Sequence, residues 1–325
     1  MKGEKVKRTN ASDDAPKPLI VVLAKYPSKG SKTRLHPLVP PPSPLPLALL
    51  KSTLASVDAV EGKARKVCVV AGEEGSDRRL VNLLNEDEGN ESEGKGSNTG
   101  LCCGGVEPWD FARVERGTDL TTALQSTLDY CRSAYGGVGI MIVGMDCPHM
   151  HQSVYERCLL SIERGVNHLV PSRDGGYVAL GLTGDTDGSV FEGVAWSSRC
   201  TGMDQLRRIL ELKGEVTVGE TNFDIDDVQD LLRLGCMIEE GKVQRLGCLE
   251  DIMRDKGLVM TRDDAAAWIS RWEKATTTGT KDADEDKPNE KSAWFREGVI
   301  FVAGAALGGL FFGLKGYRAM LWRKS

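Results

Sequence analysis

The chain has 325 residues, of which 40% are hydrophobic and 27% charged, and its formal net charge is −5. These values are typical of a globular protein and give no basic field to attract a nucleic-acid backbone, so we exclude extensive disorder, a polytopic membrane protein and a nucleic-acid partner. Nine cysteines are scattered without the paired spacings of zinc sites or disulfide scaffolds, which indicates a reducing compartment.

Three terminal segments are distinguished by composition. Residues 1–17 are rich in charge and lack the apolar stretch of a secretory signal, so we expect a disordered leader. Residues 273–293 are polar and are predicted to link the main domain to residues 294–325, which we expect to form a single membrane anchor. The anchor depends on the uncharged run 298–314, which is near the lower limit of ~17 residues for a span.

This anchor would imply a location and a partner. Because the run is last in the chain, it would insert after synthesis and leave the main domain facing the cytosol. Its shortness and the basic residues after it favour the mitochondrial or plastid outer membrane. Gly304 and Gly308, like Gly309 and Gly313, are four residues apart and would suit helix pairing in a homodimer.

The main domain, residues 18–272, alternates strand and helix patterns. Predicted strands are 19–24, 66–71, 139–143, 168–171 and 178–182; predicted helices are 47–60, 119–130 and 154–164, with a helix-rich segment from 228 to 272. Residues 85–105 have the composition of a solvated insertion loop. This order predicts a single α/β domain with a Rossmann-like, doubly wound and mostly parallel sheet covered by helices. Ligands of such sheets bind at the carboxyl ends of strands.

A basic loop, residues 25–35, follows the first predicted strand. Gly30 would allow close approach of the backbone to a ligand, and Lys25, Lys32 and Arg34 surround it with positive charge. Lys32 and Arg34 could neutralise phosphoryl oxygens. The glycine-lysine-serine/threonine order of a Walker loop is missing. The loop therefore indicates a phosphate site of another kind, with a solvated basic turn as the alternative.

Aspartates gather in two other loops. Asp146 comes directly after the third strand, and four more aspartates lie within 222–230, at a strand-to-helix junction. Mg²⁺ and Mn²⁺ take carboxylate and phosphate oxygens together, so Asp146 and one partner could hold a metal–nucleotide complex. The alternatives are a turn or cap at Asp146 and helix caps at Asp226 or Asp227.

Two further segments carry polar residues that chemistry could use. Asp174 begins the sequence DGGY at 174–177, in which the glycines suit close backbone approach or a tight turn. His149 and His151 could act as acid or base, but their alternate spacing would point them apart on a strand, and surface positions are commoner for histidine.

Taken in order, these motifs resemble one family. They are AKYP at 24–27, KTRL at 32–35, VGMDCP at 143–148, DGGY at 174–177, GVAWSS at 193–198 and DIDDVQDL at 224–231. Together they resemble the GT-A-like glycosyltransferases described as radical-SAM/selenodomain-associated transferases, within the nucleotide-diphospho-sugar transferase superfamily. The similarity extends over about residues 19–234.

The resemblance implies a GT-A-like fold with a nucleotide over the first loop. It implies that Asp146 serves like the family's metal-binding carboxylate, and Asp226 is our choice for its partner on an Mg²⁺ or Mn²⁺ ion. We also expect catalytic roles for Asp146 and Asp174, and nucleotide binding by Lys25, Gly30, Lys32, Arg34 and Asp119. The chain departs from the family at 118–123, where the sequence TDLTTA stands in place of Gly-Asp-Leu-Gly-x-Arg. There, Asp119 and Leu120 look more like the related guanylyltransferases.

Three functions are consistent with these residues. The first is glycosyl transfer from a nucleotide sugar to an unidentified small-molecule acceptor, with the metal stabilising the departing diphosphate. The second is nucleotidyl transfer from a nucleoside triphosphate to a small phosphorylated acceptor, with pyrophosphate as the leaving group. The third is a non-catalytic, membrane-held nucleotide-binding module, which the altered 118–123 segment favours and the retained lysine, arginine and aspartates oppose.

Overall fold

The computed structural model describes residues 16–26, 32–35, 44–86, 109–115, 119–244 and 246–278. The chain divides into two compact units, residues 1–269 and 270–325. Of the second unit, the structure describes the last residues of one helix, up to Thr278. Gly30 and most of the predicted leader, insertion loop and linker lie outside the described residues.

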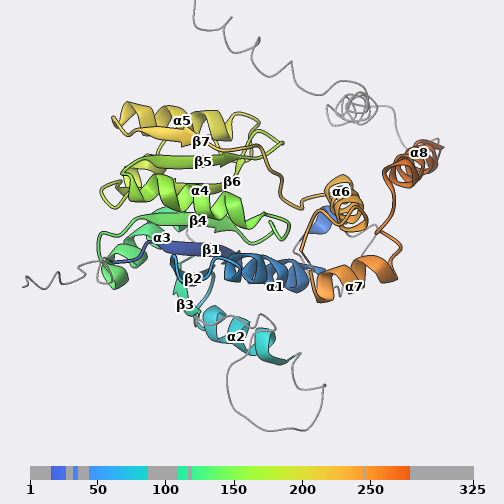
Figure 1. Cartoon of the computed structure of the whole chain (residues 1–325), viewed down its shortest axis with the longest axis horizontal. Helices are drawn as coiled ribbons and strands as arrows, with labels where there is room; N and C mark the ends of the chain where they lie inside the picture. The colour runs from blue at the N-terminus through green and yellow to red at the C-terminus, as the bar shows by residue number, and fades with distance from the viewer. Residues whose placement is uncertain are drawn as a thin grey trace, which may run out of the picture. The chain divides into compact units, whose positions relative to one another are not determined.

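Seven strands of the first unit form one sheet in the order β3-β2-β1-β4-β6-β5-β7 (Figure 1). The strands are β1 (Leu19–Lys25), β2 (Arg65–Ala71), β3 (Asp110–Val114), β4 (Ile140–Gly144), β5 (Asn167–Pro171), β6 (Tyr177–Leu182) and β7 (Val216–Val218). Long apolar runs form the central strands, because these are covered on both faces. The predicted α/β, Rossmann-like class is thereby confirmed.

The sheet is mixed. β1 runs parallel to β2 and β4, β2 to β3, and β5 to β7, whereas β6 is antiparallel to both β4 and β5. The reason is the short connection from β5 to β6, residues 172–176, which can return the chain beside β5 but is too short for a parallel crossover. Since β1, β4 and β5 point the same way, their carboxyl ends lie at one edge.

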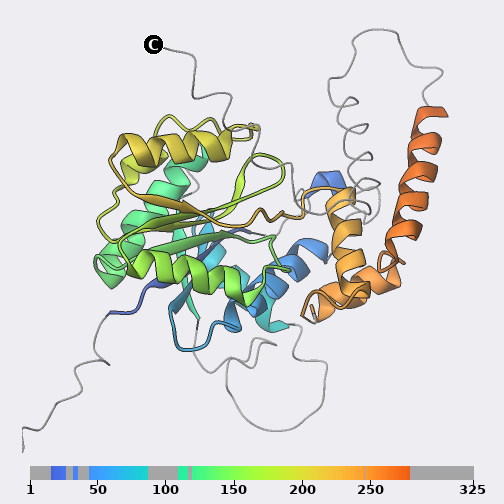
Figure 2. The same ribbon diagram turned by 45° about the horizontal axis from the view of Figure 1, so that its top comes forward.

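Two cores lie on opposite faces of the sheet. One contains Ile20, Val22 and Cys68 with residues of α1 (Leu45–Asp58), α2 (Ser76–Glu86) and α4 (Gln152–Glu163). The other contains Leu19, Val21 and Val67 with residues of α3 (Leu120–Tyr135), the 3-10 turn η3 (Gly188–Phe191) and α5 (Thr201–Glu211). Successive strand residues therefore alternate between the two cores, as a pleated strand requires. Helices lie on both sides of the sheet (Figure 2).

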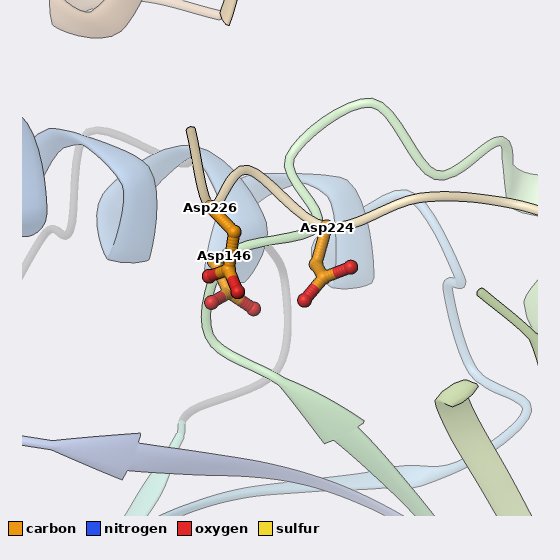
Figure 3. Close-up of side chains that lie close together, drawn as sticks. All are labelled: Asp146, Asp224 and Asp226. Carbon is orange, nitrogen blue, oxygen red and sulfur yellow. The ribbon is translucent and has the colours of Figure 1, made fainter. Parts of the chain in front are cut away.

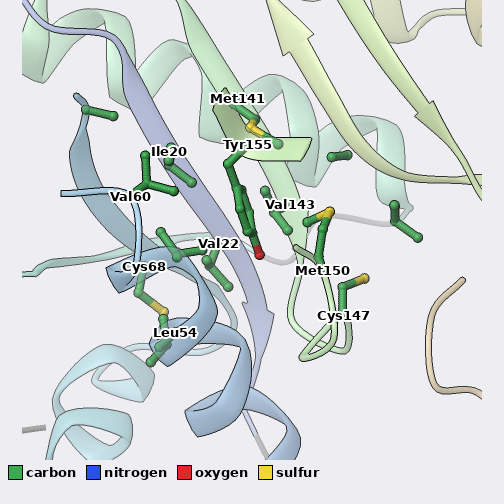
Figure 4. Packing of buried hydrophobic residues seen from close by; sticks show 14 of the residues in the cluster. Ile20, Val22, Leu54, Val60, Cys68, Met141, Val143, Cys147, Met150 and Tyr155 are labelled. Atoms are coloured by element: carbon green, nitrogen blue, oxygen red, sulfur yellow. The ribbon is translucent and has the colours of Figure 1, made fainter. Parts of the chain in front are cut away.

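Tyr155 of α4 is the largest side chain of the first core that is fully buried. Its ring lies among Val22, Met141 and Val143 (Figure 4). The hydroxyl, which would be costly to bury alone, lies 2.7 Å from Ser56 Oγ of α1. This bond joins two helices that cover the same face.

A third cluster, here called the α6–α7 core, positions the chain before α6 (Val228–Glu239). It joins Leu45 and Leu49 of α1 to α6 and α7 (Cys248–Asp255), and it includes Phe223 and Ile225. Asp227 caps α6 by accepting from the Gln229 and Asp230 backbone N–H groups, and Asp230 returns a bond to Asp227. The predicted cap at Asp227 is confirmed.

Helix ends differ from the predicted ones for local reasons. α1 begins at Leu45, before the expected start at 47, because proline is tolerated in the first turn of a helix. α2 extends into the predicted insertion loop as far as Glu86, and α8 (Arg262–Thr278) into the predicted linker. His151 caps α4, and His149 precedes it in a turn, so the expectation that the two histidines lie on a strand is wrong.

Within the described ranges, no helix is both long and apolar enough to cross a membrane. The 17-residue α8, for example, carries charged residues, whereas a span needs about 20 mostly apolar ones. This contradicts the expected single-pass protein of the mitochondrial or plastid outer membrane, and that expectation is withdrawn. Residues 294–325, with the glycine pairs proposed for dimerisation, lie outside the described residues.

Candidate functional site

Two loops meet at the edge of the sheet where β1, β4 and β5 end. The loop after β4 and the segment before α6 are joined by a bond from the Ile225 backbone N–H to the Asp146 carbonyl oxygen, 3.0 Å. The same segment is joined to the end of β5, because the Asn222 N–H donates to the Pro171 carbonyl at 2.8 Å. Backbone bonds thus fix the two acidic loops relative to each other.

Three aspartates converge where these loops meet. Asp146, Asp224 and Asp226 each offer a carboxylate oxygen within 4.8 Å of the other two. Figure 3 shows their side chains gathered together, one from the loop after β4 and two from the segment before α6. Residues two apart in an extended chain share a side, so Asp224 and Asp226 face the cluster while Ile225 is fully buried in the α6–α7 core.

The Lys32 ammonium lies among these carboxylates. Nζ donates to Asp146 Oδ2 at 2.5 Å, to Asp226 Oδ1 at 2.7 Å and to the Ile225 carbonyl at 2.6 Å. All three N–H donors of the ammonium are therefore used. Burial lowers the pKa of Lys32, but the charges and hydrogen bonds of the two aspartates outweigh burial and hold the pKa above its usual value. The charged Lys32 side chain thus joins three segments that are far apart in the sequence.

The cluster carries an excess of negative charge. Burial raises the pKa of Asp226, but Lys32, followed by Arg34, outweighs burial and holds the pKa below its usual value. Arg34 lies 3.5 Å from Asp226 and its side chain is 71% exposed, so this pair is a weak one. Asp224 has no ion-pair partner among the described residues. Its burial, and then the charges of Asp146 and Asp226, raise the pKa of Asp224 to about 6.

The donor set suits a hard divalent cation. Three carboxylates supply oxygen ligands of the kind that Mg²⁺ and Mn²⁺ prefer, and one partly buried ammonium cannot balance three negative charges. Asp224 keeps one oxygen engaged by the Ser172 hydroxyl at 2.8 Å, which orients the carboxylate. In this structure Asp146 and Asp226 each use one carboxylate oxygen to accept from Lys32.

Other predicted site residues lie around this cluster. Lys25 is exposed at the end of β1, and its charge contributes to lowering the pKa of Asp226. Asp119 is exposed and caps α3, accepting from the Thr122 backbone N–H at 2.9 Å; this bond lowers the pKa of Asp119. Asp174 Oδ1 accepts from the Gly176 N–H at 2.9 Å, and its charge helps to raise the pKa of Asp224.

Sequence reasoning did not assign Asp224 to the acidic cluster, although its spacing from Asp226 was a usable signal. It also did not foresee the pair formed by His149 and Phe223. Their ring centroids are 3.8 Å apart with an interplanar angle of 25°. His149 is 8% exposed, and its Nε2 lies 2.8 Å from Asn222 Oδ1. The expected surface position of His149 is therefore wrong.

A family model matches part of the chain. The family is described as "Uncharacterized protein conserved in bacteria (DUF2064)", and the match covers residues 108–198. That range includes Asp146 and Asp174 but not Lys32 or the segment before α6. No curated protein matches the chain.

Solved structures resemble this one over most of their length. A candidate nucleotide-diphospho-sugar transferase from Desulfovibrio desulfuricans G20 has a TM-score of 0.58 at 18% identity, over 74% of this chain and 96% of that one. A cytidylyltransferase from Leptospira borgpetersenii serovar Hardjo-bovis gives 0.42 at 15%, over 76% and 98%. A 4-diphosphocytidyl-2C-methyl-D-erythritol synthase from Anaerococcus prevotii DSM 20548 gives 0.40 at 11%, over 66% and 95%. The first match confirms the resemblance to nucleotide-diphospho-sugar transferases at the level of the fold.

Proposed function

We propose that the protein is a transferase that uses a nucleotide-activated donor, and that the reaction is glycosyl transfer from a nucleotide sugar. The observation that carries the proposal is the cluster of Asp146, Asp224 and Asp226, in which Lys32 donates to Asp146 and Asp226. This cluster lies at the carboxyl edge of the sheet, where ligands of such folds bind. The likeness to the Desulfovibrio protein supports the same class of donor.

The three aspartates would hold an Mg²⁺ or Mn²⁺ ion, which would supply positive charge for the phosphates of the donor and for the departing diphosphate. Carboxylates alone would repel such a ligand. Lys32 keeps its proton because its pKa is raised, so it brings a fixed positive charge to the same place. Arg34 is exposed beside Asp226 and can turn its guanidinium to a phosphate.

The remaining predicted residues take roles around the donor. Lys25 extends the positive rim at the end of β1, and Asp119 marks the start of α3, which follows β3 at the same edge of the sheet. Asp174 is our candidate for the group that takes the proton of the acceptor hydroxyl, because it is an exposed carboxylate near Asp224. Gly30 retains its proposed place in the phosphate loop.

The same groups could serve nucleotidyl transfer. Lys32 and Arg34 would then face a leaving pyrophosphate instead of a nucleoside diphosphate. The two reactions differ in their products, so incubation with each donor and analysis of the phosphate products separates them. Release of a nucleoside diphosphate supports glycosyl transfer, and release of pyrophosphate supports the alternative. Binding without either product would indicate a nucleotide-binding module.

The direct test of the site is Asp146→Asn. The substitution keeps the size and most hydrogen bonding of the side chain but removes the charge that a metal ion requires. We expect metal-dependent nucleotide binding to fall at least tenfold, about 1.4 kcal/mol. The measurement is titration calorimetry with UDP-, GDP-, ADP- and CDP-sugars and the nucleoside triphosphates, in EDTA and then in Mn²⁺.

Asp227→Asn is the matched control. Asp227 is close in sequence to the cluster but caps α6, and asparagine is an equally good cap. Its nucleotide affinity should equal that of the wild type. If Asp146→Asn binds as well as the wild type, or if binding is the same in EDTA and Mn²⁺, the proposed site is wrong.

A further inference from the structure

Two arginines lie beside the acidic cluster and have no part in the proposed donor site. Arg173 follows Ser172, whose hydroxyl contacts Asp224, and Arg233 lies in α6. Their guanidinium carbons are 5.9 and 5.0 Å from the centroid of the Phe223 ring. Phe223 itself precedes Asp224, so the pair is linked to the cluster through two chain segments.

Among the described residues, only one of the two arginines has an ion-pair partner. Arg233 forms an ion pair with Asp230 at 2.9 Å, but Asp230 also accepts from the Asp226 and Asp227 backbone N–H groups at 3.3 Å. Arg173 is an exposed residue, and its guanidinium has no hydrogen-bond or ion-pair partner among the described residues. Partial burial, and then the charge of Arg233, lower the pKa of Arg173, and the charge of Asp230 opposes them only in part, so the two cations repel each other.

The support beneath the arginines is rigid. Phe223 is 5% exposed and stacks on the buried His149 ring. The Arg173 backbone N–H donates to the Asn222 carbonyl at 3.1 Å, and Asn222 Oδ1 accepts from the Phe223 N–H at 3.0 Å. Two like charges are thus held near each other on an aromatic platform, an arrangement that an anion would relieve.

We propose that Arg173 and Arg233 bind an anionic group, a phosphate or a carboxylate, of the acceptor substrate. The guanidinium forks match the oxygens of both groups. The assignment to the acceptor rests on the proposed function, because it takes the basic loop after β1 as the site of the donor phosphates. In the sheet order, β4 and Asp146 lie between β1, which leads to Lys32, and β5, which leads to Arg173. The acidic cluster therefore separates a donor side from an acceptor side.

The test uses the full chain in EDTA, titrated calorimetrically with inorganic phosphate and, separately, with acetate. At least one probe should bind the wild type, and Arg173→Gln should weaken that binding at least tenfold. The probe that binds more tightly identifies the acceptor group. Arg173→Lys keeps the charge but loses the forked guanidinium, so its affinity for the probe should lie between those of the wild type and Arg173→Gln. Arg207→Gln is the matched control, because Arg207 is an exposed arginine of α5 paired with Asp204.

The outcomes separate this inference from the proposed function. Asp146→Asn should keep the binding of phosphate or acetate in EDTA while losing metal-dependent nucleotide binding. Arg173→Gln should show the reverse, with nucleotide binding retained. If neither probe binds the wild type, or if Arg173→Gln binds as tightly as Arg207→Gln, the anion site is refuted, whatever the nucleotide experiment shows.

Discussion

Lys32 combines an uncommon backbone conformation with a fully used ammonium group. Its φ of 54° lies in the left-handed region, which residues other than glycine seldom adopt. Such conformations cost on the order of 1–3 kcal/mol and persist where the surroundings determine them. Here the surroundings are the two aspartates and the Ile225 carbonyl that accept from Nζ. Strain of this kind is common at ligand sites, which agrees with the role proposed for this loop.

His149 predicts a specific acid sensitivity. Burial lowers the pKa of His149; the bond to Asn222 opposes this and the charges of Arg233 and Arg173 reinforce it, so that the pKa is about 4. An unfolded histidine has a pKa of ~6.5. As the pH falls, the unfolded chain therefore binds a proton at His149 before the folded protein does. Through this residue, the free energy of unfolding drops by about 2 kcal/mol between pH 7 and pH 5. The buried Nδ1 of His149 also has no hydrogen-bond partner in the part of the chain that the structure describes.

His149→Phe removes the titrating group and keeps a ring against Phe223. We expect the free energy of unfolding to decline less steeply from pH 7 to pH 5 in this variant than in the wild type. Urea unfolding at both pH values measures the difference. Equal declines in the two proteins would show that His149 is not held neutral in the fold.

The loop between β5 and β6 depends on a glycine that no other residue can replace easily. Gly175 has a φ of +92°, and a Cβ placed there would lie 2.0 Å from the Arg199 carbonyl oxygen. The Gly202 N–H also donates to the Gly175 carbonyl at 2.8 Å, which joins the loop to the start of α5. Arg173 and Asp174 take their positions from this loop.

Gly175→Ala should therefore destabilise the protein by more than the unfavourable backbone conformation alone would. Gly193 offers the matched control, since its φ is +75° and a Cβ there meets nothing within 4 Å. We expect Gly193→Ala to destabilise by about 1–2 kcal/mol, and Gly175→Ala by at least ~1 kcal/mol more, because the Arg199 backbone must move. Denaturant unfolding of both variants decides this. Equal losses would mean that the loop accommodates the methyl group without cost.

The elements that sequence predicted correctly are those with long apolar runs. The patterns at 19–24, 66–71 and 139–143 became β1, β2 and β4, because a strand buried on both faces must be apolar throughout. β3 and β7 were not predicted: β3 mixes exposed and buried residues, and β7 has three residues at the edge of the sheet. The reversed direction of β6 depends on the brevity of one connection, which periodicity does not reveal.

The site was predicted in its residue types but not in its contacts. Lys32, Asp146 and Asp226 were expected at one edge because each follows or precedes a strand pattern, and the structure brings them together. That Lys32 contacts the carboxylates directly could not be foreseen, because it depends on segments 114 and 194 residues apart. The same holds for Asp224, whose membership requires the bond between the Ile225 N–H and the Asp146 carbonyl.

Because these segments are distant in the chain, the repulsion among their carboxylates opposes folding of the first unit as a whole. Asp224 shows the effect most clearly: its folded pKa of about 6 lies above the ~3.9 of an unfolded aspartate. A carboxyl group with a raised folded pKa destabilises the fold fully above that pKa, and the penalty fades as the pH falls from the folded pKa to the unfolded one. At pH 7 in EDTA the penalty is about 1–3 kcal/mol.

Asp224→Asn should remove this penalty while keeping an oxygen that accepts from Ser172. We expect the variant to be more stable than the wild type in EDTA at pH 7, and to lose most of the additional stability that Mn²⁺ gives the wild type. The gain should fall to about half at pH 5, because Asp224 in the fold is then largely protonated while an unfolded aspartate is still ionised. Asp129→Asn, at an exposed position of α3, should change neither quantity. The measurement is urea unfolding at pH 7 and pH 5, in EDTA and in Mn²⁺. If Asp224→Asn is less stable than the wild type in EDTA, the Asp224 carboxylate stabilises the fold, and the expectation that the cluster destabilises it is wrong.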